Sequence, residues 1–373
     1  MRNIKLLAII DHLGGGGAEQ QFVNIVNNIT AEKQVYLTVA RGVRLASLDS
    51  RIPLSGGYGG RTPLKSIMKI RGLIESFQPD IVHSFLMYSC FLTALALKLS
   101  RVKPVFIAQE FSSPEEIMKE VNFGYLKKQI LKLTYKQADK VLTISKAVME
   151  DMIQIKYVSG GKAAFIHDGL DIKKYKNLKD KMALRKELGL EDGLFYICFA
   201  GSLVKRKGPH FLIKAFRRLP YPNIRLLLIG KGDMAEELKR ESADDVRISF
   251  LGYRTNAVEY IKSADLFVLP SVYEGLPNVV IEAMAAGTPV VATNIYGTPE
   301  LIEDKKSGIL VPAGDVDALE KAISEMIGNT GEREMFSKEA LTRADYFSIE
   351  RMAGDYQAMY STLLEKPTTK RPR

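Results

Sequence analysis

The sequence predicts an α/β protein built from two doubly wound parallel-sheet domains in tandem. The first reason is length, because 373 residues that are 46% hydrophobic exceed what one core usually organises and supply enough apolar material for two. The second is alternation, since short β-branched apolar runs are separated by stretches with helical periodicity. The third is an ordinary composition, with 26% charged residues, which disfavours disordered and fibrous classes.

Each strand is expected where a short apolar run stands between helical stretches. In the first half the predicted strands are Lys5–Ile10, Val35–Ala40, Ile81–Phe85, Val105–Gln109, Val141–Ser145 and Ala164–His167. In the second half they are Phe195–Ala200, Ile224–Ile229, Val246–Leu251, Leu266–Pro270, Pro289–Thr293 and Gly308–Val311. Continuous apolar strands of this kind are typical of parallel sheets covered by helices on both faces.

The domain boundary is expected in the charge-rich segment Asp171–Asp192, which lacks a long apolar run. The sequence therefore predicts an N-terminal domain over residues 1–175, a C-terminal domain over 190–345 and a central cleft between them. Residues 348–364 have helical periodicity and no following strand, so we expect this helix to dock back on the N-terminal domain. Ligands of open parallel sheets bind beyond the carboxyl ends of the strands, which makes the loops there the candidate site.

Several classes of protein are disfavoured by composition. Cys90 and Cys198 stand alone, and no CxxC or HxxxH spacing occurs, so we expect neither a disulfide framework nor a metal site. The longest apolar stretch, Phe85–Leu97, has 13 residues and is too short to span a bilayer. The run Leu6–Ile10 is too short for a signal-peptide core, so a cytoplasmic location is expected.

The net charge of +10 resides in the first half, where residues 1–180 hold 26 basic and 16 acidic residues, against 27 and 27 in the rest. In the expected helix Glu116–Lys136, the residues Lys128, Lys132 and Lys136 form a basic stripe. The stripe is consistent with peripheral binding to an anionic membrane surface, on the inner face of the cell membrane, and equally with a solvated lysine face. No RNP, KH or zinc-finger pattern supports specific nucleic-acid binding.

The segment Pro270–Gly287 predicts a helix that begins at the carboxyl end of a strand, with Pro277 at its start. Its first backbone amides, with the helix dipole behind them, suit phosphate oxygens. Glu282 is the one charge within an otherwise apolar helix, and ribose hydroxyls are suitable donors to such a carboxylate. A solvent-facing Glu282 explains the pattern equally well.

Two further loops follow predicted strands. The loop after Ala200 carries Lys205, Arg206 and Lys207, which suit phosphate neutralisation or, alternatively, form a solvated basic loop. The loop Asp11–Glu19 carries four glycines, which allow close backbone approach. Its spacing departs from the dinucleotide fingerprint, so a dehydrogenase is disfavoured, and a plain β–α turn is as plausible.

These motifs together resemble the family 4 retaining glycosyltransferases of the GT-B fold, which consists of two Rossmann-like domains. The resemblance covers nearly the whole chain and is strongest over Phe195–Leu319. It rests on GSLVKRKG, LLLIGKGD, FLGYR, EGLPNVVIEAMAAGTPVVAT, GTPELI and SGILVPAGD in order, with LGGGGAEQQ and VLTISKAVMEDMI in the first half.

The resemblance implies roles for particular residues. Lys207, Glu274 and Arg206 are the catalytic candidates: Lys207 would bind phosphate, Glu274 the hydroxyls of the donor sugar, and Arg206 or Lys205 would replace the arginine usual at the position of Ser202. Glu282 would bind the nucleotide ribose. The remaining donor-binding candidates are Gly16, Gly17, Ser202, Tyr253, Arg254, Gly275, Leu276, Pro277 and Asn278. Many members carry a histidine after the fourth strand, where this chain has Gln109 and Glu110; these two and His83 are the acceptor-side candidates.

The resemblance implies transfer of a hexose-type sugar, with retention, from a UDP- or GDP-sugar to a hydroxyl of a glycan or lipid-linked acceptor. Bacterial cell-surface polysaccharide or glycolipid synthesis is the expected setting, without metal or true cofactor. The alternative is a GT-B-like UDP-sugar epimerase or hydrolase, which would form product from donor alone. A nucleic-acid-binding protein is less favoured. The sequence separates neither the nucleotides nor the sugars.

Overall fold

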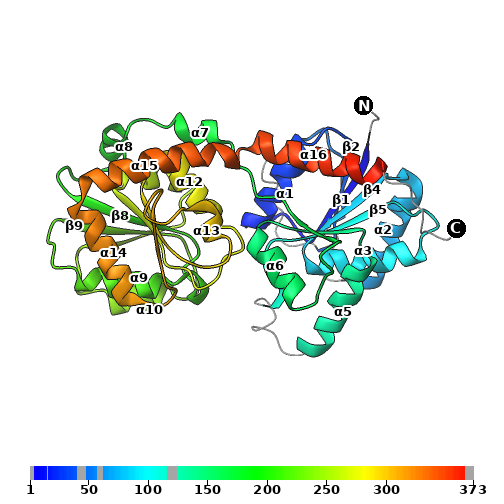
Figure 1. The fold of residues 1–373 in the computed structure, drawn as a ribbon, viewed down its shortest axis with the longest axis horizontal. Coiled ribbons are helices and arrows are strands. Elements are labelled where there is room, and N and C mark those ends of the chain that lie inside the picture. The colour runs from blue at the N-terminus through cyan, green and yellow to red at the C-terminus, as the bar shows by residue number, and fades with distance from the viewer. Residues whose placement is uncertain (1–3, 15, 40–47, 57–61, 116–123, 366–373) are drawn as a thin grey trace. The chain divides into compact units, whose positions relative to one another are not determined.

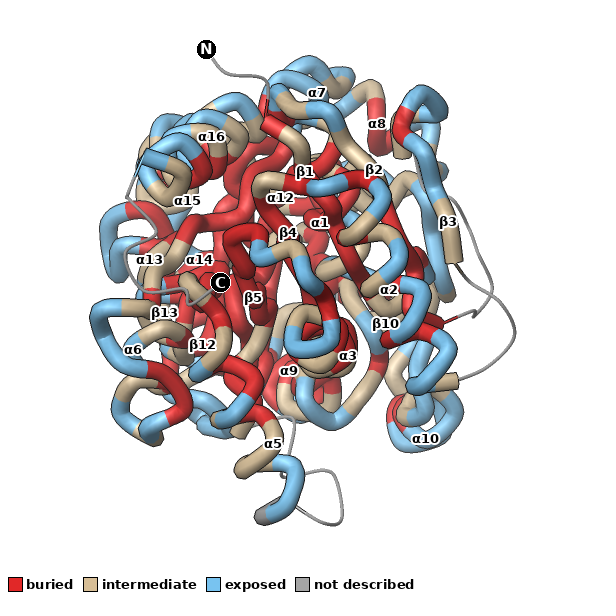
Figure 2. The backbone as a smooth tube through the Cα atoms, turned by 90° about the vertical axis from the view of Figure 1, so that its right-hand side faces the viewer, coloured by how far each residue is buried: buried red, intermediate tan, exposed pale blue. Residues whose placement is uncertain are grey.

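The computed structural model describes residues 4–14, 16–39, 48–56, 62–115 and 124–365. The chain divides into two compact units (Figure 1). Unit 1 comprises residues 1–169 and 349–373, and unit 2 comprises residues 170–348. Each unit contains a twisted parallel sheet with helices packed against it, as the sequence predicts. Figure 2 shows buried residues concentrated along the strands, whereas exposed residues lie mainly on helices and loops.

In its described part, unit 1 contains a seven-stranded sheet in the order β3-β2-β1-β4-β5-β6-β7. Its strands are β1 (Lys5–Ile10), β2 (Glu32–Leu37), β3 (Leu54–Gly56), β4 (Ile81–Phe85), β5 (Val105–Glu110), β6 (Lys140–Thr143) and β7 (Ala163–Phe165). Its helices are α1 (Gly17–Asn28), α2 (Pro63–Phe77), α3 (Met87–Leu99), α5 (Gly124–Gln137), α6 (Lys146–Gln154) and α16 (Ile349–Glu365).

The core of unit 1 follows from alternation along its strands. Leu7 and Val82 point to the side where α2 contributes Ile70 and α3 contributes Leu92, and all four side chains are fully buried. The neighbouring residues in β4 point to the opposite face, so that the Phe85 ring meets Phe22 of α1 at 4.9 Å. Successive side chains of a strand alternate between faces, so both faces need a covering helix layer.

The C-terminal helix α16 completes unit 1 by packing beside α1. Its Tyr356 and Tyr360 are almost completely buried. The Tyr356 hydroxyl donates to Oε1 of Gln109 at 2.9 Å, and the Tyr360 hydroxyl lies 2.7 Å from Nδ1 of His83. Because buried polar groups need partners, these bonds fix where α16 lies on the sheet.

Unit 2 contains a six-stranded sheet in the order β10-β9-β8-β11-β12-β13. Its strands are β8 (Phe195–Ala200), β9 (Ile224–Ile229), β10 (Ile248–Gly252), β11 (Leu266–Leu269), β12 (Val290–Thr293) and β13 (Ile309–Val311). Its helices are α7 (Ile172–Lys176), α8 (Lys181–Leu188), α9 (Pro209–Arg218), α10 (Ala235–Glu241), α11 (Ala257–Ser263), α12 (Asn278–Ala286), α13 (Thr298–Leu301), α14 (Val316–Gly328) and α15 (Thr330–Ala344), with 3-10 turns η1 (Lys205–Lys207) and η2 (Asp345–Phe347).

Some elements differ from the sequence-based expectation. Strand β2 begins at Glu32 rather than Val35, and the three-residue edge strand β3 was not predicted. Residues 171–192 form α7 and α8 within unit 2. Of the expected helix 116–136, residues 124–136 lie in α5 and residues 116–123 lie outside the described part. Across that described part, no helix is long and apolar enough to cross a membrane.

Candidate active site

The candidate site in unit 2 lies at the point where the strand order of its sheet reverses. Strands β8 and β11 are hydrogen-bonded neighbours, although three helices and two strands separate them in sequence. One loop, residues 201–208, follows β8, and another, residues 270–277, follows β11. Adjacent parallel strands that lead to opposite sides leave a crevice at their carboxyl ends, which is the usual ligand position in this class of sheet.

A glycine explains how the two loops approach each other. Gly208 has a φ of 67°, and a Cβ there would overlap the carbonyl oxygen of Pro270. The Val272 amide donates to the Arg206 carbonyl at 2.8 Å, which joins the loops through their backbones. Since only glycine has both the required conformational freedom and no Cβ, Gly208 is needed for this close approach.

The loops are also joined by charge. Nζ of Lys207 lies 2.5 Å from Oε1 of Glu274, which also accepts from the Ser271 hydroxyl at 2.7 Å. Nη1 of Arg206 donates to the Tyr273 carbonyl at 3.1 Å and lies 3.7 Å from Oε2 of Glu274. The Glu274 side chain is 7% exposed, Lys207 18% and Arg206 42%, so the cations lie toward solvent and the carboxylate lies beneath them.

Helix α12 begins directly after the second loop. No side chain caps it, and the Val280 amide donates to the Pro277 carbonyl at 2.9 Å. Within the described part, Oδ1 of Asn278 is buried without a hydrogen-bond partner. Gly275, Leu276 and Pro277 are buried. An uncapped helix start beside two cations can bind the oxygens of a phosphate group.

Glu282 lies one turn further along α12. Oε1 of Glu282 accepts from the Tyr175 hydroxyl of α7 at 3.4 Å. Burial raises the pKa of Glu282 to about 7, against the lowering effects of the Tyr175 bond and of Lys174. Sequence patterns did not indicate Tyr175, because it lies in the charged segment where no pattern marks a site.

The remaining donor-binding candidates lie at separate places. Ser202, Tyr253 and Arg254 are exposed, and among the interactions of the described residues none joins their side chains to Lys207 or Glu274. The Tyr253 ring lies 5.9 Å from Nζ of Lys231. In unit 1, Gly16 and Gly17 are exposed at the start of α1.

The Gly16 turn is held by its own neighbours. Nδ1 of His12 lies 3.2 Å from Oε1 of Glu19 and 3.2 Å from the Gly14 amide. A Cβ on Gly16 would overlap the Glu19 carboxylate. A larger residue at position 16 would therefore displace the Glu19 carboxylate from over the loop.

The acceptor-side candidates occupy both faces of the unit 1 sheet. His83 and Gln109 are fully buried and bonded to α16, and burial lowers the pKa of His83 to about 3. Glu110 points to the other face, where its Oε1 accepts from the Tyr135 hydroxyl at 2.9 Å. Burial, with the charge of Asp11, raises the pKa of Glu110 to about 8.

The lysines of the expected stripe have different surroundings. Nζ of Lys128 pairs with Glu115 at 2.9 Å, whereas Nζ of Lys132 lies 5.9 Å from the centre of the Tyr157 ring. Lys136 is exposed. The described residues contain no group of three or more His, Cys, Asp or Glu side chains placed to hold a metal ion.

Two family models match the chain in succession. Residues 15–174 match Glycosyltransferase Family 4, and residues 180–343 match Glycosyl transferases group 1. A Campylobacter jejuni N-acetylgalactosamine-N,N'-diacetylbacillosaminyl-diphospho-undecaprenol 4-alpha-N-acetylgalactosaminyltransferase is 26% identical over 94% of this chain and 98% of that protein. An Escherichia coli UDP-Gal:alpha-D-GlcNAc-diphosphoundecaprenol alpha-1,3-galactosyltransferase is 26% identical over 70% of this chain and 69% of that protein.

Solved structures share the fold. Anabaena HepE in complex with UDP has a TM-score of 0.85 at 23% identity, covering 96% of this chain and 100% of that chain. WaaG, a glycosyltransferase involved in lipopolysaccharide biosynthesis, has a TM-score of 0.75 at 16% identity. The match covers 95% of this chain and 99% of the WaaG chain. The fold and the matched families define a glycosyltransferase of the GT-B fold, which confirms the fold class predicted from the sequence. The chain belongs to glycosyltransferase family 4.

Proposed function

We propose that this glycosyltransferase moves a hexose-type sugar from a UDP- or GDP-sugar to a hydroxyl of a glycan or lipid-linked acceptor, with retention of anomeric configuration. The observation that carries the proposal is the 2.5 Å contact between Lys207 and Glu274, which joins the loops after β8 and β11. The donor diphosphate would lie against these loops, and Glu274 would bind hydroxyls of the sugar.

The chemistry assigned to this site is stabilisation of the leaving group. As the bond from the anomeric carbon to the diphosphate oxygen breaks, negative charge develops on the diphosphate. Lys207, Arg206 and the first amides of α12 would stabilise that charge without a metal ion. The acceptor hydroxyl would attack from the same face and pass its proton to the departing phosphate, which gives retention without an enzyme nucleophile. Glu282 would accept hydrogen bonds from the ribose.

The setting that we propose is bacterial cell-surface polysaccharide or glycolipid synthesis at the cytoplasmic face of the membrane. The names of the two relatives include diphospho-undecaprenol acceptors, which supports a lipid-linked acceptor. A UDP donor is supported by the UDP-Gal in the name of the second relative and by the UDP bound to Anabaena HepE. On the acceptor side, Glu110, Gln109 and His83 stay candidates by resemblance; all three are buried, and Glu110 lies on the opposite face of the sheet from the other two.

The proposal is tested with a panel of UDP- and GDP-sugars. A donor that binds only the folded protein raises the melting temperature, so one nucleotide series is expected to stabilise the protein and the other is not. Transfer is then measured with that donor and undecaprenyl-diphosphate sugars, with and without EDTA. Product that forms only with acceptor, and equally in EDTA, supports the proposal. Product from donor alone would instead indicate an epimerase or hydrolase, and no stabilisation by any donor contradicts nucleotide-sugar binding.

A further inference from the structure

Tyr296 has a backbone conformation that its residue type disfavours. Its φ is 35°, in the left-handed region that glycine adopts readily and a bulky residue rarely adopts. The next residue, Gly297, could take such a conformation, yet its φ is −75°, an ordinary value for any residue. The chain therefore has a tyrosine, and not the adjacent glycine, at the strained position of this turn.

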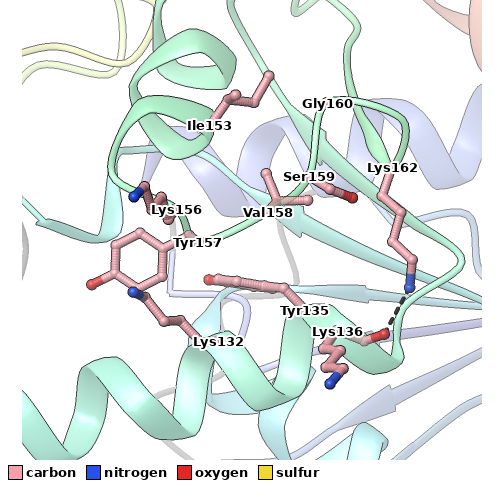
Figure 3. A pocket seen from close by; sticks show the side chains of 10 residues that line it. All are labelled: Lys132, Tyr135, Lys136, Ile153, Lys156, Tyr157, Val158, Ser159, Gly160 and Lys162. Carbon is pink, nitrogen blue, oxygen red and sulfur yellow. Dashed lines mark hydrogen bonds between the residues drawn. The ribbon is translucent and has the colours of Figure 1, made fainter.

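Helix termination does not explain the strain at Tyr296. Gln78 is the C-cap of α2, and Lys156, which lines a cavity of about 590 Å³ in unit 1 (Figure 3), follows the C-cap of α6. Left-handed residues are common at both of these positions, because they end a helix. Tyr296 instead lies three residues after the end of a strand, β12. Strained residues cluster at active sites, so the surroundings of Tyr296 bear on function.

The turn lies beside the candidate site. Strand β12 is the neighbour of β11 in the parallel sheet, so the loops that follow them lie at the same edge. The Tyr296 ring packs edge-on against the ring of Tyr273, with centroids 4.6 Å apart and an interplanar angle of 74°. Aromatic pairs in this arrangement stabilise more than their buried area alone. A second link is the Thr293 hydroxyl, which donates to the Ser271 carbonyl at 2.5 Å.

Tyr273 connects this packing to the charged groups. It directly precedes Glu274, and its carbonyl accepts from Nη1 of Arg206 at 3.1 Å. Tyr273 is 5% exposed, so its ring cannot shift without moving packed neighbours. Residues 271–274 are thus held on one side by the loop after β8 and on the other by the loop after β12.

We propose that Tyr296 is a positioning residue for sugar transfer. Its ring fixes Tyr273, and thereby holds the Glu274 carboxylate and the Arg206 guanidinium in the geometry that the transition state requires. This inference rests on the function proposed above, in which those two groups bind the donor sugar and stabilise the leaving diphosphate. Fixed charges stabilise a transition state without rearranging, and small displacements of them reduce the rate. The left-handed backbone sets the direction of the Cα–Cβ bond of Tyr296, and hence the side on which its ring lies.

Steady-state kinetics with the nucleotide sugar that stabilises the protein test the proposal. Y296A should lower kcat about 10- to 100-fold, while donor Kd changes less than about threefold because the contacts to the nucleotide remain. Y296F keeps the ring and should retain a kcat within about threefold of wild type. The control Y221A removes a partly buried tyrosine at the amino ends of the strands, where its hydroxyl lies 2.9 Å from that of Ser324. It should lower the melting temperature and leave kcat nearly unchanged.

Thermal melting isolates the backbone strain. Y296G and Y296A both lack the ring, but only glycine relaxes the left-handed backbone, so Y296G should melt about 2–4 °C above Y296A. At an unstrained position glycine would be the less stable of the two. Y296G should nevertheless lose as much kcat as Y296A, which separates the loss of activity from any loss of stability.

Three outcomes would overturn the proposal. Near-normal kcat in Y296A, with a melting temperature lowered as in Y221A, would leave the ring with a structural role alone. An equal loss of kcat in Y296F would assign the effect to the hydroxyl instead of the packing. A lower melting temperature for Y296G than for Y296A would show that position 296 is unstrained.

Lys207→Ala separates these results from a failure of the proposed function. Loss of turnover in K207A together with normal turnover in Y296A would reject the positioning role alone. Normal turnover in K207A, or transfer from none of the donors, would reject the proposed function and the positioning role with it.

Discussion

The two units place opposite charges at equivalent points of the same topology. In each sheet the order reverses between two neighbouring strands, β1 and β4 in unit 1 and β8 and β11 in unit 2. In each unit, a charged residue in the loop after the first strand of the pair contacts the loop or helix that follows the second strand of the pair. In unit 2 it is Lys207, which contacts Glu274. In unit 1 it is Asp11, which accepts from the amide and the hydroxyl of Ser89 at 3.0 and 2.5 Å.

This difference in charge corresponds to a difference between two helix N-termini, that of α3 in unit 1 and that of α12 in unit 2. In unit 1 the Asp11 carboxylate, whose pKa is raised by burial, already satisfies the first turn of α3. In unit 2 no side chain caps α12, and cations lie beside it. A helix start that binds a carboxylate of its own chain is a structural element, whereas one left uncapped beside cations is suited to an anionic ligand.

The largest effect is expected from Lys207→Ala. Loss of the ammonium that we propose offsets charge on the leaving diphosphate should lower kcat/KM for transfer about 100- to 1,000-fold. The fold should remain stable, since Ser271 still donates to Glu274. The control Lys214→Ala, at an exposed position of α9, should lose less than threefold. Initial rates with the stabilising donor measure both variants, and near-normal turnover of K207A would remove the phosphate-binding role from this loop.

The second effect concerns stability rather than catalysis. Asp11→Ala leaves the buried amide of Ser89 without its acceptor, while the Ser89 hydroxyl keeps Thr38 as a partner at 3.0 Å, and should lower the free energy of unfolding by about 1–3 kcal/mol. Donor should still raise the melting temperature, because the proposed donor site lies in unit 2. Glu75→Ala, which breaks a surface ion pair with Arg71, is the matched control and should lower the stability much less. Denaturant titration that finds equal losses in both would contradict a structural role for Asp11.

The smallest effect is a pH dependence carried by Glu282. Its pKa of about 7 lies above the ordinary value because the folded site is buried, so protonation accompanies a fall in pH from 8 to 6. A protonated carboxyl accepts hydrogen bonds from ribose less well, and donor affinity should fall up to about tenfold over this range. The stability of the unliganded fold depends on pH in the opposite direction to donor affinity. Because the pKa of Glu282 is raised in the folded state, its contribution to the free energy of unfolding is fully present below about pH 4.5 and is lost as the pH rises through 7.

The measurement is donor Kd by calorimetry at several pH values. Glu282→Gln should bind more weakly at pH 8 and show little change between pH 8 and pH 6. Glu236→Gln on α10, where the carboxylate is exposed, should keep the wild-type profile. A wild-type profile in E282Q would assign the titration to another group.

Much of unit 2 could be predicted from sequence because its determinants are local. Apolar runs indicated all six strands, and the rule for the carboxyl ends of parallel strands correctly brought together two loops that lie 67 residues apart. The role of Gly208 at the contact required the structure, because its partner is a backbone carbonyl of the other loop.

The surroundings of the acceptor-side candidates could not be predicted in this way. His83 and Gln109 contact side chains 277 and 247 residues away on α16, and no local pattern encodes such pairs. The short edge strand β3 lacked a hydrophobic run, and β2 begins with three polar residues, so periodicity placed it three residues too late. Tyr175 was missed because only its contact with Glu282 distinguishes it from other residues of a charged segment.

The position of α16 has a consequence for how the chain folds during synthesis. Unit 1 is discontinuous, since its last helix follows the rest of the unit by about 180 residues. At roughly 5–20 residues per second, a ribosome needs about 10–40 s to make that interval. Throughout this time one face of the unit 1 sheet is uncovered, and His83 and Gln109 on that face still lack their partners Tyr360 and Tyr356. Unit 2 is therefore free to fold before unit 1 is complete, and a truncation before residue 349 should leave the earlier-made unit unfinished.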